Sequence, residues 1–164
     1  MRGAKLLVRG PEPFGQNAVL CHAVQDAVRP HHGGIHRPGE YEEKGIFVEG
    51  IPDGGETIYT VKAEEINLCY MGKTAHALKE DEIKEIGDID ILFVPLGETA
   101  EDVKKATALI SKIDPKIVIP TFYNDLTLHE FKKAEGIVDG ELDILKIKKS
   151  ELPMDERKNI VLTN

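Results

Sequence analysis

The feature that most limits the fold of this chain is a pair of apolar runs separated by an amphipathic stretch. Asp90–Leu96 is almost continuously apolar, which predicts a strand that is covered on both faces, and Lys116–Pro120 is a second run of this kind. Between them, Thr99 and Asp102 have the spacing of a capping box, and apolar residues follow at helical spacing (Val103, Ala106, Ile110, Ile113). We therefore expect two neighbouring buried strands joined by a helix of about fourteen residues.

Further short runs extend this sheet. Ile46–Ile51 and Thr57–Val61 flank the turn-forming segment Pro52–Gly55, which predicts a hairpin, and Ile66–Met71 adds a third strand. Glu80–Ile86 has helical spacing and ends at a glycine. The remaining expected elements are short strands and one more helix, whose cap is expected at Thr127 and Glu130 (strands Ala4–Val8, Ala18–Cys21, Leu142–Ile147, Ile160–Leu162).

Composition limits the cellular setting and the partners. The length of 164 residues predicts a single domain spanning residues 1–164. The formal charge of −8 disfavours nucleic acid and membrane surfaces as partners, and no apolar run is long enough for a membrane span. Cys21 and Cys69 lack CxxC spacing, which indicates reduced, buried thiols. We expect a cytoplasmic protein.

Several motifs occur in the order seen in one enzyme family. The segment Pro38–Ile46 (PGEYEEKGI) resembles the small metallo-β-lactamase-fold hydrolases related to ascorbate-6-phosphate lactonase. Further matching segments follow in register, so that the resemblance covers roughly Val19 to the C-terminus (Thr57–Tyr59, Leu68–Gly72, Glu85–Leu92, Pro115–Pro120, Ile147–Pro153). The resemblance implies an α/β fold of the αββα sandwich type, with two mixed sheets, helices outside, and metals at one edge.

The N-terminal region departs from the family pattern. Members open with a further β-hairpin, whereas Leu6–Pro11 stands here where the family has a later strand that ends in Asp-Pro. The chain therefore resembles an N-terminally truncated member. Two explanations remain open: the protein folds with an open sheet edge, or the true start lies upstream of Met1.

The first metal-binding motif of the family is only partly present. The pattern His-x-His-x-Asp-His aligns with residues 22–27, where His22 and Asp26 keep ligating side chains. Val24 and Ala27 occupy the other two ligand positions of this motif. The resemblance thus leaves His22 and Asp26 as residual metal ligands.

The later ligand positions are also replaced. Lys73 stands where the family has an aspartate after glycine, Phe122 stands where it has a late histidine, and the shortened loop Pro52–Gly55 carries no histidine. Because a binuclear zinc site needs converging imidazoles and carboxylates, we expect no site of the family type. We expect Val24, Ala27, Lys73 and Phe122 to meet near His22 as a vestigial site, with the Lys73 ammonium paired to Asp26.

Other histidines offer alternative ligands. His31, His32 and His36 lie close behind His22 and could rebuild a site for one zinc ion, although an exposed, solvated loop is the favoured explanation. Lys73 and His76 could form an anion-binding or acid–base pair, but the composition of this stretch favours a surface connection.

Three functions are compatible with this pattern. The favoured one is a non-catalytic binding or assembly module, with no cofactor and with self-association through an open sheet edge. The alternative is a metal-dependent hydrolase of an ester, lactone or phosphoester, with one zinc or other divalent metal in a reduced or rearranged site. A decayed gene product that folds without a selected activity is the third. The sequence does not decide whether the chain is an enzyme, and it indicates no substrate.

Overall fold

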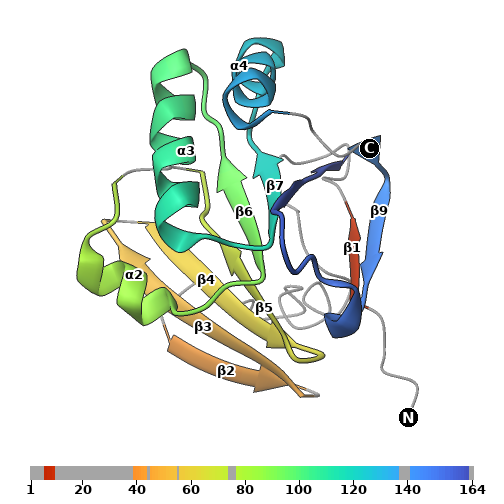
Figure 1. Ribbon diagram of the computed structural model, residues 1–164. Coiled ribbons are helices and arrows are strands. Elements are labelled where there is room, and N and C mark those ends of the chain that lie inside the picture. The colour runs from red at the N-terminus through yellow and green to blue at the C-terminus, as the bar shows by residue number, and fades with distance from the viewer. Residues whose placement is uncertain are drawn as a thin grey trace.

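The computed structural model describes residues 6–9, 39–43, 45–54, 56–73, 77–136 and 141–162. Its centre is a seven-stranded sheet with the strand order β10-β7-β6-β5-β4-β3-β2 (Figure 1). The strands of this sheet are β2 (Gly39–Glu43), β3 (Ile46–Asp53), β4 (Glu56–Ala63), β5 (Ile66–Tyr70), β6 (Ile91–Pro95), β7 (Ile117–Thr121) and β10 (Lys158–Asn159).

The sheet changes pairing at β5. Strands β2 to β5 form an antiparallel meander, in which Val48 pairs with Val61 and Val61 with Leu68. From β5 onward the strands run parallel, and Ile91 of β6 pairs with Ile117 of β7. Every residue of β6 and β7 is buried, which confirms the expectation of neighbouring strands covered on both faces.

Three helices cover one face of this sheet (Figure 1). They are α2 (Glu80–Ile86), α3 (Ala100–Ile113) and α4 (Asp125–Glu135). They enclose a core that includes Ile110 and Phe131, both fully buried, together with the thiol of Cys69. Burial raises the pKa of Cys69 to about 12, so that this thiol stays protonated and unreactive in the folded protein.

The opposite face of the large sheet carries a second β-layer. Strand β1 (Leu6–Arg9) pairs antiparallel with β9 (Ile144–Ile147), and β8 (Glu141–Leu142) pairs parallel with β11 (Val161–Leu162). Leu145 and Ile147 pack against Ile119 of the large sheet in a second apolar core. The described part of the chain therefore forms three stacked layers: the helices, the large sheet and the second β-layer. These layers correspond to three layers of the predicted αββα sandwich.

Four details differ from the sequence-based expectation. Strand β2 was not expected, because its polar sequence GEYEE lacks an apolar face. The cap of α4 is Asn124 rather than Thr127, since the Asn124 side chain accepts a hydrogen bond from the Thr127 backbone at 2.9 Å. The expected strand Leu142–Ile147 is divided at Asp143 into β8 and β9, which belong to different sheets. The short strand β10 was also not expected.

An ionic network fastens the amino ends of the parallel strands. Asp90, which is only 5% exposed, accepts hydrogen bonds from Lys116 Nζ at 2.9 Å and from Lys149 Nζ at 2.8 Å. The backbone N–H of Asn67 donates a third at 2.9 Å. One carboxylate thus joins β5, the residue before β7 and the 3₁₀ turn Lys149–Glu151.

None of the described helices is long and apolar enough to cross a membrane.

Candidate functional site

The candidate site lies where the parallel strands β5, β6 and β7 end. Met71 donates its backbone N–H to Phe93 at 3.2 Å, and Leu96 donates to Thr121 at 2.9 Å, so the three connections leave the sheet at one edge. The carboxyl ends of parallel strands are where open α/β sheets bind their ligands. This edge is therefore the candidate functional site.

Each of these strands is followed by a residue with a positive φ. Gly72 has φ 74° and Gly97 has φ 69°, whereas the corresponding residue after β7 is Phe122, with φ 45°. A bulky residue in this region is rare and strained by roughly 1–3 kcal/mol. Surrounding structure must therefore hold the half-buried Phe122 in place.

The connections after β6 and β7 are tied together. Thr127 Oγ1 donates a hydrogen bond to the carbonyl of Gly97 at 3.2 Å, and Asn124 Nδ2 donates to the carbonyl of Glu98 at 3.2 Å. Asp102 Oδ2 accepts from both the N–H and the hydroxyl of Thr99, which closes the predicted capping box and holds the pKa of Asp102 below its ordinary value. These hydrogen bonds hold the start of α3 and the start of α4 next to each other.

Gly97 allows this arrangement, and substituting it should be costly. A Cβ atom at Gly97 would lie 2.6 Å from Asp102 Cβ, so Gly97→Ala combines backbone strain with displacement of the cap. We expect a loss of about 2 kcal/mol in the free energy of unfolding, measured by urea denaturation. Gly136→Ala is the matched control, because Gly136 also has a positive φ but has open space around it. Equal losses in the two variants would contradict a role for the Asp102 contact.

Thr121 is a site residue that the sequence analysis missed. Its side chain is on the same strand face as Ile117 and Ile119, toward the second β-layer, and it is only 3% exposed. Its hydroxyl oxygen has no hydrogen-bond partner among the described residues. The signal in the sequence is a hydroxyl residue at the end of an apolar run. A buried, unsatisfied hydroxyl is uncommon and costs stability, which makes Thr121 a candidate functional residue.

Tyr123 follows on the same connection. Burial raises the pKa of its half-buried phenol, and the negative charge of Glu141 raises it further. The phenol is therefore neutral near pH 7 and can donate or accept a hydrogen bond.

The structure brings two of the sequence-predicted site residues to this edge. Lys73 follows β5 and is exposed, and Phe122 follows β7. Lys73 forms no ion pair with any described residue, so its expected pairing with Asp26 remains a prediction. The other predicted positions lie outside the described residues, and so does Cys21 (His22, Val24, Asp26, Ala27, His31, His32, His36, His76).

Comparison with known proteins gives the family. A family model described as the Beta-lactamase superfamily domain matches residues 7–122, which is more than half of the chain. This chain belongs to the metallo-β-lactamase superfamily. The superfamily assignment confirms the resemblance seen in the sequence motifs and the α/β fold that the resemblance implied.

Similar solved structures agree with the fold. A Thermotoga maritima protein, whose name assigns it to the Zn-dependent hydrolases of the metallo-β-lactamase superfamily, is 27% identical with a TM-score of 0.68, covering 82% of this chain and 77% of its own. The metallo-β-lactamase fold protein YhfI from Bacillus subtilis is 10% identical with a TM-score of 0.51, covering 85% of this chain and 57% of its own. A Parabacteroides distasonis protein named as a metal-dependent hydrolase is 15% identical with a TM-score of 0.50, covering 77% and 55%. The last two support the fold alone.

The described part of the edge does not fit the metal pair of the superfamily. At the two described positions that the sequence motifs align with family ligands, Lys73 supplies an ammonium group and Phe122 a hydrocarbon ring, and neither is a usual zinc ligand. Within the described residues, no group of three or more His, Cys, Asp or Glu side chains could hold a metal ion. Zinc chemistry would therefore need ligands from the histidines outside those residues.

Proposed function

We propose that this member of the metallo-β-lactamase superfamily is a non-catalytic binding or assembly module. The observation that carries the proposal is the position of Lys73 and Phe122 at the carboxyl edge of the parallel strands. There, the resemblance to the family predicts a metal-bridging carboxylate and a late imidazole. An ammonium group at such a position repels a divalent cation instead of holding it.

A second candidate is a hydrolase with a rearranged site. The name of the Thermotoga maritima relative favours this candidate, since that protein is assigned to the Zn-dependent hydrolases. Catalytic zinc needs at least three protein ligands and one open position for water. His22 and Asp26 would supply two of these ligands, and a third would have to come from His31, His32, His36 or His76. Such a site would act on an ester, lactone or phosphoester.

Metal content and hydrolytic activity separate the two candidates. The binding module should purify with less than one equivalent of zinc, manganese or iron. It should show no chelator-sensitive hydrolysis of chromogenic esters, lactones or phosphodiesters. Elemental analysis and a substrate panel with and without chelator measure both quantities. One full equivalent of tightly bound metal, together with activity that His22→Ala abolishes, would replace the binding module with the hydrolase.

A further inference from the structure

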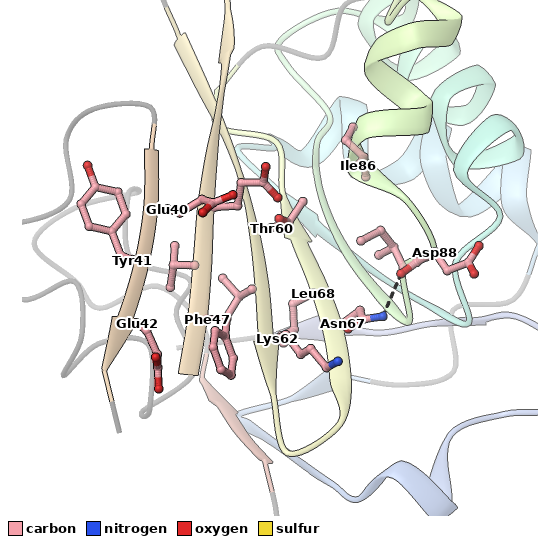
Figure 2. Close-up of a pocket in the computed structure, with 14 residues that line it drawn as sticks. Glu40, Tyr41, Glu42, Phe47, Thr60, Lys62, Asn67, Leu68, Ile86 and Asp88 are labelled. Carbon is pink, nitrogen blue, oxygen red and sulfur yellow. Dashed lines mark hydrogen bonds between the residues drawn. The ribbon is translucent and has the colours of Figure 1, made fainter. Parts of the chain in front are cut away.

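A groove of about 670 Å³ opens on the helix-bearing face of the antiparallel strands, away from the carboxyl edge. Its floor is the surface of β2, β3 and β4, and its far wall is the chain that leaves α2 (Figure 2). The side-chain amide of Asn67 in β5 donates a hydrogen bond to the carbonyl of Asp88 at 3.1 Å, drawn as a dashed line in Figure 2, and so joins the floor to the far wall. The side chains discussed below line this groove (Glu40, Glu42, Phe47, Glu49, Lys62, Asp88).

The floor of the groove consists of two cross-strand rows. Glu40 pairs with Glu49, and in the next row Phe47 lies between Glu42 and Lys62. Side chains of directly paired residues stand on the same face of a sheet, so all five project toward the groove. The helices cover the apolar part of this face farther along but leave these rows open, and Phe47 is 51% exposed.

The charges on this floor are unbalanced. Glu40, Glu42 and Glu49 form no hydrogen bond or ion pair with the described residues, and exposed Asp88 adds a fourth carboxylate at the wall. Lys62 is the single cationic side chain among the described residues that line the groove. Two like charges directly opposite each other destabilise a sheet, and no ion pair with a described residue relieves the repulsion between Glu40 and Glu49.

We propose that this groove is a docking surface for a basic segment of a partner protein, in which arginine or lysine alternates with aliphatic residues. Alternate side chains of an extended segment point to one side, so its cations can reach the Glu40–Glu49 row and Glu42. A guanidinium group can also lie over the exposed ring of Phe47. A second copy of this chain is disfavoured, because its net charge is −8 and its own groove would bring carboxylates against carboxylates.

A peptide-binding experiment tests this surface without reference to metal. The probe is a short fluorescein-labelled peptide that alternates arginine with leucine, and fluorescence anisotropy with the full chain measures its affinity. Replacing arginine with glutamine in the peptide should abolish binding, and raising the salt concentration should weaken it. The double variant Glu40→Gln/Glu49→Gln should lose at least tenfold in affinity, and Phe47→Ala about threefold.

The matched control is Asp155→Asn/Glu156→Gln, which removes the same charge from exposed residues next to β10, at the opposite edge of the sheet. Its affinity should equal that of the parent. A second variant, Glu40→Lys, should raise Tm by about 1–3 °C by relieving the repulsion while it weakens peptide binding, which separates lost binding from lost folding. Absence of binding, equal losses in the groove and control variants, or self-association through these residues would overturn the proposal.

Discussion

Replacing Asp90 by alanine should destabilise the protein by about 3 kcal/mol, because it leaves two lysines without the carboxylate that joins them. Asp90 is only 5% exposed, whereas the side chains of Lys116 and Lys149 are 45% and 43% exposed. Since water can partly rehydrate these ammonium groups, we expect the lower end of the range for broken buried pairs. Urea denaturation at pH 7 measures the loss.

A control with an exposed pair shows whether burial causes this effect. Glu101 lies 3.4 Å from Lys104, and their side chains are 66% and 76% exposed, so Glu101→Ala should change the free energy of unfolding by less than about 0.5 kcal/mol. A loss at Asp90 as small as the loss at Glu101 would show that the network contributes little to stability.

The same network makes the free energy of unfolding depend on pH. Burial would raise the pKa of Asp90, but the hydrogen bonds from Asn67, Lys149 and Lys116 outweigh it and hold the pKa below its ordinary value. The folded pKa is therefore lower than the unfolded value of about 3.9. The stability that ionised Asp90 contributes to the fold is fully present above about pH 4 and is lost as the pH falls through the pKa of Asp90 in the folded protein. Asp90→Asn should therefore flatten the acid limb of the stability curve.

Restoring the family ligands at the carboxyl edge should create metal affinity. We expect the double variant Lys73→Asp/Phe122→His to bind zinc at least tenfold more tightly than the parent chain, because it replaces a repelling ammonium with a carboxylate and adds an imidazole. Competition with a chromophoric zinc chelator measures the affinity. The gain requires that His22 and Asp26, the residual ligands predicted from the sequence motifs, face the same edge, so the experiment also tests that alignment.

The matched control places the same two residues on exposed helix positions. In Lys112→Asp/Leu126→His, the new carboxylate lies in the last turn of α3 and the new imidazole near the start of α4. This control should bind zinc no better than the parent. Equal affinity in both double variants would indicate adventitious surface binding, and no gain in either would show that positions 73 and 122 are not former ligand positions.

The apolar pattern of the sequence predicted the elements that are buried on both faces, such as β6 and β7, and the helix α3, which is buried on one face. A short, continuous apolar run, as in β6 and β7, fits a strand that is buried on both faces. Apolar residues at helical spacing, as in α3, fit a helix with one buried face. Strand β2 could not be predicted in this way, because an edge strand with polar side chains on an open face has no apolar period. The cap of α4 was misplaced because Asn124 and Thr127 both have capping side chains, and only the hydrogen bonds distinguish them.

Only the site residues that belong to the family motifs could be predicted from the sequence. Lys73 and Phe122 were found through resemblance to the family, and the structure places both at the carboxyl edge. Thr121 was missed, because its importance depends on burial without a hydrogen-bond partner, which requires coordinates. The groove was missed for the same reason, since Glu40 and Glu49 become neighbours only through strand pairing.

The pairing of β1 with β9 has a consequence for the order of folding. Leu6 lies opposite Ile147, so this contact joins segments from near the two ends of the chain, whereas β3, β4 and β5 pair with their immediate successors. Contacts between distant segments form late, because a long loop must close first. During synthesis on the ribosome, β1 therefore remains without its partner until residues 144–147 have emerged, long after the meander can form.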